Sequence, residues 1–279
     1  MNSAEFQIMG VVNVTPDSFS DGGRYLDAQA AIAHGLELEA EGAVILDVGG
    51  ESTRPGADPV PEAEELRRVM PVIEGLIERG TAAKISIDTS KSTVAARALQ
   101  AGATLVNDVT ALRGDPEMAG TVARAGADCC LMHMLGDPRT MQRDPHYDDV
   151  VGDIKTFLEE RMAFATRAGI AEERILIDPG IGFGKTTEHN LELLRRLDEF
   201  LELGRPLVIG TSRKTFLGRL TGRQSPSDRV AATIATNVLA YERGARIFRV
   251  HDVAPVHDAL TLTAATVSAP WTTRTSTTK

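Results

Sequence analysis

The chain has 279 residues, of which 42% are hydrophobic and 25% are charged, and its formal net charge is −9. This composition is typical of a soluble globular protein with one large core or two small ones. The negative charge argues against nucleic acid or an acidic membrane surface as the main partner. No apolar run is long enough to cross a bilayer, and the N-terminus lacks the basic and apolar segments of a signal peptide.

The only two cysteines, Cys129 and Cys130, are adjacent and lie in an apolar run. Adjacent cysteines cannot build a disulfide framework. Their position predicts buried, reduced thiols, so we expect a cytoplasmic protein.

Eight short runs rich in valine, isoleucine and leucine predict buried strands. In chain order they are IMGVV (8–12), AVILDV (43–48), KISID (84–88), ATLVND (103–108), CCLMH (129–133), RILID (174–178), PLVIG (206–210) and ARIFRV (245–250). Because these runs are apolar throughout, they suit a sheet that is covered on both faces.

The segments between the predicted strands have the spacing of helices. Two such faces consist of Ile32, Leu36 and Ala40, and of Leu191, Leu194, Leu197 and Leu201. Eight strand–helix units in this length predict a single (β/α)8 barrel, with a doubly wound open sheet as the alternative. We assign residues 1–269 to the barrel and expect the threonine-rich tail, 270–279, to be disordered.

Polar side chains follow each predicted strand at the point where it ends. They are Asn13, Asp47, Asp88, Asn107, Asp108, His133, Asp178, Thr211, Ser212, His251 and Asp252. In a barrel all these strand ends converge on one rim, where barrel active sites lie. Polar residues are common wherever strands stop, but their repetition over eight strands predicts a polar pocket at this rim.

Cations gather beyond the same strand ends, and they are Arg54, Arg213, Lys214 and Arg249. In an acidic protein this concentration predicts an anion site, although solvated surface arginines are the alternative. Arg249 and His251 are two positions apart, so on an extended segment they point to the same side and could hold a phosphate. Asn13, across the rim, could supply an oxygen ligand to Mg2+ carried by that phosphate.

Two carboxylates, Asp88 and Asp178, end the third and sixth predicted strands. A buried carboxylate needs a partner, and a planar heterocycle with adjacent N–H donors would satisfy one of them. A pair of catalytic acids or of metal ligands is the alternative. Only His133 and His251 lie near them, which argues against a zinc site.

The segment DPGIGFGKTT resembles a phosphate-binding loop, but Pro179 occupies the position of its first glycine. A nucleotide-hydrolysing enzyme or kinase is therefore disfavoured. We expect the glycines to let the backbone approach a flat ligand, with Phe183 as an apolar contact. Lys185 is expected to be an exposed residue near a helix start.

The segment NVTPDSFSDGG, residues 13–23, is a long connection without helical or strand period. Such connections are often functional loops. We expect it to close over the pocket as a lid, with Gly22 and Gly23 as a hinge.

Seven segments together resemble the dihydropteroate synthase family: MGVVNVTPDSFSDGG, DVGGESTRPGA, SIDTSK, NDV, DPGIGFGKT, GTSRKTFLG and RVHDV. They follow the family's order from Met9 to Val253. The resemblance implies a (β/α)8 barrel, a homodimer and a requirement for Mg2+. It also implies condensation of p-aminobenzoate with 6-hydroxymethyl-7,8-dihydropterin diphosphate, giving 7,8-dihydropteroate and pyrophosphate. No nucleic-acid or membrane partner is expected.

The resemblance also assigns site residues to this chain. It implies pterin contacts at Asp88, Asn107, Asp178 and Lys214, apolar ring contacts at Met132 and Phe183, diphosphate and Mg2+ contacts at Asn13, Arg249 and His251, and loop contacts at Phe19, Asp21, Thr53 and Arg54. Of these, Asp21, Lys214, Arg249 and His251 are the implied catalytic residues. Thr215 stands where the family often has a serine that holds the p-aminobenzoate carboxylate, and its hydroxyl is retained.

Two other functions remain open at this point. Methyltransferases that act on folates use a similar pterin-binding barrel, but they do not need the anion set of TSRK and RVHD. A pterin-binding protein without catalytic activity is the second alternative. Among family members, susceptibility to sulfonamides is associated with residues such as Phe19, Thr53 and Pro55, so we expect sulfonamides to inhibit this protein.

Overall fold

The computed structural model describes residues 6–14, 24–54 and 56–268. Its eight strands are all parallel and lie in the order β6-β5-β4-β3-β2-β1-β8-β7. They are β1 (Gln7–Asn13), β2 (Ile45–Gly49), β3 (Lys84–Asp88), β4 (Leu105–Asp108), β5 (Asp128–Met132), β6 (Ile175–Asp178), β7 (Val208–Ile209) and β8 (Ile247–Val250). Each of the eight predicted strands is therefore confirmed.

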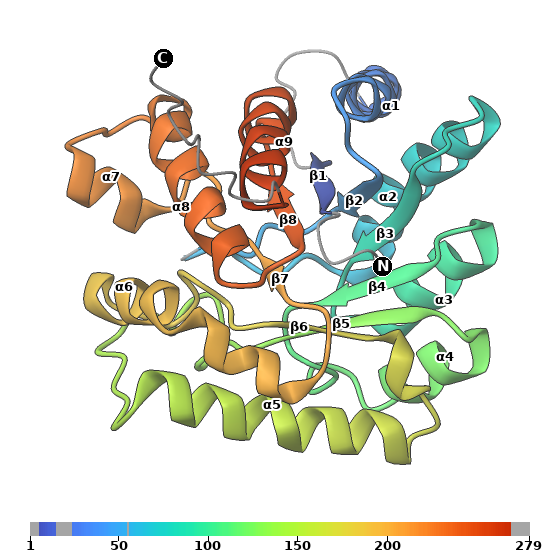
Figure 1. Ribbon diagram of the computed structural model, residues 1–279. Helices are drawn as coiled ribbons and strands as arrows, with labels where there is room; N and C mark the ends of the chain where they lie inside the picture. Colours follow the sequence, from blue (N-terminus) through green and yellow to red (C-terminus); the bar gives the residue numbers. More distant parts are fainter. Residues whose placement is uncertain (1–5, 15–23, 55, 269–279) are drawn as a thin grey trace, which may run out of the picture.

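The two ends of the sheet meet between β6 and β7. Ile177 of β6 forms an isolated parallel bridge with Leu207, and its amide donates to the carbonyl oxygen of Pro206 over 3.1 Å. The sheet thus closes into a nearly complete (β/α)8 barrel, with the strands inside and the helices around them (Figure 1). The predicted barrel is confirmed, and the open-sheet alternative is wrong.

Helices follow the strands along the chain. The α-helices are α1 (Arg24–Ala40), α2 (Glu62–Glu78), α3 (Ser92–Ala101), α4 (Met118–Ala125), α5 (Val150–Arg167), α6 (Thr187–Arg195), α7 (Thr215–Thr221), α8 (Val230–Glu242) and α9 (Val253–Ser268), and the 3-10 helices are η1 (Glu172–Arg174), η2 (Leu197–Leu203) and η3 (Pro226–Arg229). Among the described residues, no helix is long and apolar enough to span a membrane.

Two predicted helix faces are only partly right. The leucine face was expected to be continuous, but α6 ends at Arg195 and the chain re-enters a helix as η2 after the non-helical Arg196. Leu191 and Leu201 are 37% and 42% exposed, while Leu194 and Leu197 are buried, so the four leucines do not form one buried face. On α1, Ile32 is buried but Ala40, at its last residue, is exposed.

The core has two layers, which follow from the alternation of side chains along each strand. One set of side chains faces the helices, and the other fills the barrel interior with Met9, Ile45, Leu105, Cys130, Val208 and Ile247. Both cysteines are buried and free, as predicted. Because the period is two, the residue two positions after an interior side chain faces the interior again, one layer closer to the carboxyl rim.

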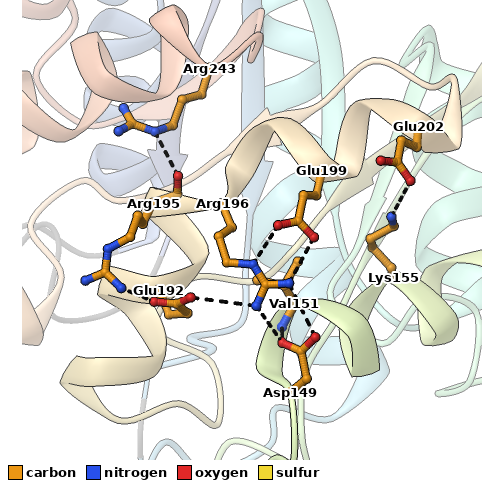
Figure 2. Close-up of polar contacts among 9 residues, drawn as sticks. All are labelled: Asp149, Val151, Lys155, Glu192, Arg195, Arg196, Glu199, Glu202 and Arg243. Carbon is orange, nitrogen blue, oxygen red and sulfur yellow. Dashed lines mark hydrogen bonds and ion pairs between the residues drawn. The ribbon is translucent and has the colours of Figure 1, made fainter.

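The outer surface of α5, α6 and η2 carries a cluster of exposed and half-exposed charges (Figure 2). Arg196 donates to Asp149, the N-cap residue of α5, and to Glu199 of η2. Lys155 of α5 pairs with Glu202 over 2.7 Å. These pairs hold α5 against Arg196 and η2, which follow α6 in the chain.

Candidate active site

The polar layer at the carboxyl rim lies directly above the apolar barrel interior. Five side chains of this layer each stand two positions after a residue of the apolar interior or, for Asp178, after Leu176, which packs against it. They are Asp47, Asn107, Met132, Asp178 and Arg249. Strand register also aligns these ends, since Asp88 is opposite Asn107 and Met132 is opposite Asp178. The sequence-predicted pocket is therefore brought together by strand geometry.

Asp47 is the centre of a buried network. Its carboxylate accepts from the Ser86 hydroxyl (2.6 Å), the Asn107 amide (3.0 Å) and the Arg249 Nε (2.6 Å). Arg249 also donates from Nη2 to Asp88 over 2.7 Å. The guanidinium is therefore held between two carboxylates, which fixes its plane at the rim.

Burial has a strong effect on the acid of this network. It raises the pKa of Asp88 to about 7; Arg249 opposes the increase and Asp47 adds to it. Arg249 keeps its proton, because the two carboxylates beside it raise its pKa further despite burial. Near neutral pH, proton gain or loss by Asp88 changes the net charge around Arg249.

Asp178 ends β6 on the opposite wall. Its Oδ1 accepts from the Gly180 amide over 2.7 Å, and its backbone carbonyl accepts from the His133 amide over 3.0 Å. Burial raises the pKa of the Asp178 carboxyl, while this amide and Lys214 lower it. The rim thus holds a second desolvated acid with a cation nearby.

Lys214 lies beside that acid and over an aromatic ring. Its Nζ is 3.8 Å from the centroid of the Phe183 ring, a cation–π contact. Burial lowers the pKa of Lys214 to about 7, against the attraction of Asp178. Gly182 permits this arrangement, since a Cβ there would lie 2.9 Å from the Lys214 Cδ.

His251 follows β8 and faces the loop after β7. Its backbone amide and its Nδ1 both contact the Ser212 hydroxyl, at 3.2 and 3.1 Å. Burial and then the charge of Arg249 lower the pKa of His251 to about 3, and Arg54 contributes to this decrease. The imidazole is therefore neutral at physiological pH.

One prediction about a cation is wrong. Lys185, expected to be exposed, is 3% exposed because its side chain runs inward, where Nζ lies 3.0 Å from His133 Nδ1 and donates to the Phe183 carbonyl over 2.9 Å. Arg213, another of the cations expected to bind an anion, forms a two-point ion pair with Asp252 at 2.9 and 2.5 Å, and its place in an anion site stays a prediction. Arg213 therefore links the loops that follow β7 and β8.

The glycines of DPGIGFGKTT permit close approaches within the protein itself, and the expected approach of a flat ligand stays a prediction. All three have positive φ, and a Cβ on Gly180 would lie 1.8 Å from the His133 carbonyl oxygen. A Cβ on Gly184 would likewise approach Leu135 at 2.6 Å. Because Gly180 and Gly184 allow the turn to pack against His133 and Leu135, the Phe183 ring lies next to Lys214.

The remaining predicted residues lie around this layer. Asn13 ends β1 opposite Gly49, which is itself opposite Asp88. Thr53 is half-buried and Arg54 exposed in the loop after β2, and Thr215 is exposed at the start of α7. Phe19, Asp21 and Pro55 lie outside the described residues, as do most of the expected lid and both of its hinge glycines.

Sequence reasoning named Asp47 only as a strand end and did not include Ser86. Ser86 stands two positions before Asp88, so the same period of two could have placed it on the interior face. In the described part of the chain, no group of three or more His, Cys, Asp and Glu side chains could hold a metal ion.

A nearly closed parallel barrel with charged side chains at its carboxyl rim is an architecture that many enzymes share, and comparison with known proteins shows the family. The family model described as "Pterin binding enzyme" matches residues 9–251. Dihydropteroate synthase of Escherichia coli K12 is 45% identical over 94% of this chain and 92% of that protein. The chain therefore belongs to the pterin-binding enzymes and, among them, to the dihydropteroate synthases, which are transferases.

Solved structures show the same likeness. Dihydropteroate synthase from Xanthomonas albilineans, in complex with 7,8-dihydropteroate, has a TM-score of 0.88 and 48% identity, covering 97% of each chain. The Yersinia pestis enzyme, in a sulfonamide drug complex, has a TM-score of 0.91 and 43% identity, covering 96% of this chain and 97% of the other.

Proposed function

We propose that this protein condenses 6-hydroxymethyl-7,8-dihydropterin diphosphate with p-aminobenzoate, giving 7,8-dihydropteroate and pyrophosphate. The observation that carries the proposal is the rim itself, where the acid Asp178 and the cations Lys214 and Arg249 surround one mouth. The similar Xanthomonas enzyme that is in complex with 7,8-dihydropteroate supports this reading.

We assign the pterin to the wall formed by Asp178 and Asn107. Asp178 Oδ1 accepts from Gly180 and keeps a second lone pair, so the two carboxylate oxygens together would accept the paired N–H donors of the heterocycle. Met132 and Phe183 belong to one apolar cluster at this rim, and they would contact the faces of the ring. Binding would supply the buried carboxylate with the donors that its desolvation demands.

We assign the diphosphate to Arg249 and His251. In the reaction the C–O bond to the exocyclic methylene breaks, and its electron pair leaves with pyrophosphate. Arg249 would stabilise the developing negative charge, and because the His251 imidazole is neutral it would act as a hydrogen-bond donor. The delocalised pterin cation is then attacked by the neutral amine, which afterwards loses a proton.

Mg2+ enters the proposal through Asn13. Its amide oxygen at the end of β1 is a hard ligand of the kind Mg2+ accepts, and Mg2+ commonly takes only one or two protein ligands beside phosphate oxygens. Such an ion would arrive with the diphosphate. When bound, Mg2+ would supply positive charge to the leaving group.

We assign p-aminobenzoate to the open side of the mouth, bounded by Thr53, Arg54 and Thr215, with Phe19 and Asp21 contributing from the preceding loop. Thr215 is an exposed residue that directly precedes the buried part of α7, and its hydroxyl would hold the carboxylate of p-aminobenzoate. Asp21, Lys214, Arg249 and His251 are the catalytic residues of this proposal. The mechanism needs no nucleophilic side chain, because the pterin forms its own electrophile.

Sulfonamides would compete for the same place, as the similar Yersinia enzyme in a drug complex suggests. Thr53 is a half-buried residue of the loop after β2, and a pocket rejects a larger analogue only through a steric or unpaired polar group, which a threonine at this position would not add. We expect the inhibition constant of sulfamethoxazole to lie within about tenfold of the Michaelis constant for p-aminobenzoate. Binding that is hundreds of times weaker would contradict this assignment of the loops.

The proposal includes a cytoplasmic homodimer. Three exposed leucines, Leu191, Leu220 and Leu239, lie on α6, α7 and α8, and we assign them to the contact with a second copy. Sedimentation equilibrium of the purified protein tests this part, and a monomer at all concentrations would contradict it.

Product identification tests the activity. Incubation with both substrates and Mg2+ should yield 7,8-dihydropteroate, identified by mass spectrometry after chromatography. Omission of either substrate should abolish it. Methyl transfer from methyltetrahydrofolate to cobalamin, without dihydropteroate formation, would favour the methyltransferase, and pterin binding without either product would favour a binding protein.

A further inference from the structure

Three charged side chains form a cluster beside the mouth that the proposed mechanism does not use. Lys91 precedes α3, Glu51 follows β2 and Glu65 lies in the first turns of α2. The Lys91 Nζ donates to Glu51 and, over 2.5 Å, to Glu65. We refer to Glu51, Glu65 and Lys91 as the Lys91 clamp.

The clamp closes the loop that connects β2 to α2. Glu51 lies at the beginning of this loop, and its Oε2 also accepts from the backbone amide of Val60, near the end, over 3.1 Å. The carbonyl of Gly50 is held separately by Arg68 Nη1 of α2 over 2.8 Å. A single carboxylate therefore joins both ends of the loop to Lys91.

The charges of the clamp do not balance. One ammonium faces two carboxylates, and Glu65 is fully buried while its Oε1 has no hydrogen-bond partner. Apolar side chains of similar volume often pack such a place with equal or greater stability. The charges therefore contribute directional contacts that fix geometry, at some cost in stability.

The position of the clamp connects it to the second substrate. The loop that it closes carries Thr53 and Arg54, and Arg54 is near enough to His251 to influence its protonation. Glu65 likewise acts electrostatically on Asp88 at the rim. The clamp is thus close to the mouth, although none of its three members is assigned to either substrate.

We propose that Lys91 is a positioning residue: through Glu51 and Glu65 it holds the 51–60 loop so that Thr53 and Arg54 are preset to complete the p-aminobenzoate site. The inference rests on the proposed function for its kinetic consequence. Its structural consequence, an ordered loop, is independent of that function. A preset loop lowers the cost of ordering the site when p-aminobenzoate binds.

The kinetic test compares Lys91→Met with Lys84→Met. Lys84 stands at the opposite end of β3, where its side chain is 60% exposed, so it is a matched control. Lys91→Met should raise the Michaelis constant for p-aminobenzoate at least about tenfold, and leave that for the pterin diphosphate within about threefold. In Lys91→Arg the Michaelis constant for p-aminobenzoate should stay much closer to the wild-type value, because arginine keeps the positive charge and the hydrogen-bond donors. Lys84→Met should change neither constant.

The structural test is hydrogen–deuterium exchange of the peptide that contains Val60. Exchange should be faster in Lys91→Met than in the wild type or in Lys84→Met, since the carboxylate that accepts from this amide is released. If the wild type shows no dihydropteroate formation but exchange still responds, the proposed function fails and the clamp stands.

A second variant keeps the inference testable if Lys91→Met does not fold. Glu51→Ala removes the link to the loop and leaves the ion pair between Lys91 and Glu65 intact. It should reproduce the faster exchange and the selective rise in the p-aminobenzoate constant. Equal increases of both Michaelis constants, or unchanged exchange at Val60 in either variant, would overturn the positioning role.

Discussion

The rim of the barrel and the outer surface of α5, α6 and η2 contain the same kinds of charged side chains in opposite circumstances. On the surface, Asp149 is half-exposed, and hydrogen bonds from Arg196 hold the pKa of its carboxyl below the usual range (Figure 2). At the rim, Asp88 also meets an arginine, yet burial raises its pKa to about 7. At the rim, the effect of desolvation on the carboxyl pKa is larger than the effect of the nearby guanidinium. On the surface, the effect of the guanidinium is the larger one.

This difference separates structural from chemical use of charge. An exposed pair contributes little free energy and responds weakly to pH, because water and salt screen it. A buried set has groups that titrate near neutral pH and that depend on one another, which is what proton and charge chemistry requires. The following variants are chosen to break or sharpen the contrast.

The largest effect is expected for Arg249→Met. The substitution removes the guanidinium that is assigned to stabilise the leaving diphosphate. It also leaves the carboxylates of Asp47 and Asp88 buried without the cation that pairs with them. We expect kcat/KM to fall at least about 100-fold and the free energy of unfolding to fall by about 3–5 kcal/mol. Steady-state kinetics and urea unfolding measure the two effects, and retained activity would remove Arg249 from the mechanism.

The next effect is expected for Asp178→Asn, which replaces the acceptor of the pterin donors by an amide. Loss of a charged hydrogen-bond partner should weaken pterin binding by about 1.5–3 kcal/mol. Asp128→Asn is the control, since Asp128 starts β5 at the opposite end of the barrel and pairs with Arg174 over 3.1 Å. Calorimetry with a pterin ligand should separate the two variants, and equal affinities would contradict the site.

A smaller, pH-dependent effect is expected for Lys214. Its pKa is about 7 in the folded protein and near the ordinary lysine value of 10.5 in the unfolded chain, so the folded state releases the proton at lower pH. The cost that the buried ammonium of Lys214 adds to the free energy of folding is complete below pH 7. This cost disappears as the pH rises toward 10.5. The stability of the wild type relative to Lys214→Met should therefore increase from pH 7 to pH 9.

Urea unfolding of both proteins at several pH values measures this difference. Lys155→Met on α5 is the control, because hydrogen bonding to Glu202 raises the pKa of that lysine. A stability difference that does not change with pH would show that Lys214 is not desolvated.

The smallest effect is expected for Arg196→Met in the surface cluster. Its contacts to Asp149, Glu192 and Glu199 are all on partly exposed side chains. We expect only a small loss in the free energy of unfolding, because solvent and salt screen exposed pairs, and unchanged kinetic constants. Thermal unfolding and the activity assay check this, and an effect as large as that of Arg249→Met would erase the contrast.

The sequence was sufficient to predict the barrel and the location of the rim. Apolar runs mark strands by composition, and parallel topology then brings Asp88, Asn107 and Asp178 to one end without further information. The pairings within the rim could not be predicted in this way. Arg249 binds Asp47 across 202 positions, and nothing local to either residue indicates the partner.

Packing rather than local pattern decides where two of the predicted cations lie. Lys185 sits near a helix start, a place that favours exposure, but the turn at Gly180 and Gly184 carries it inward to His133. Arg213 adopts a left-handed conformation, with φ of 59°, and pairs with Asp252 from the neighbouring loop. Both outcomes depend on contacts between segments far apart in the sequence.

A crystal structure with a non-hydrolysable analogue of the pterin diphosphate tests the central claim most directly, namely that the buried charges of the rim hold the reacting substrate. The claim predicts the pterin donor edge within hydrogen-bond distance of the Asp178 carboxylate. It also predicts diphosphate oxygens within hydrogen-bond distance of Arg249 and His251. A ligand bound elsewhere, or a reversed ligand with its diphosphate at Asp178, would contradict the account.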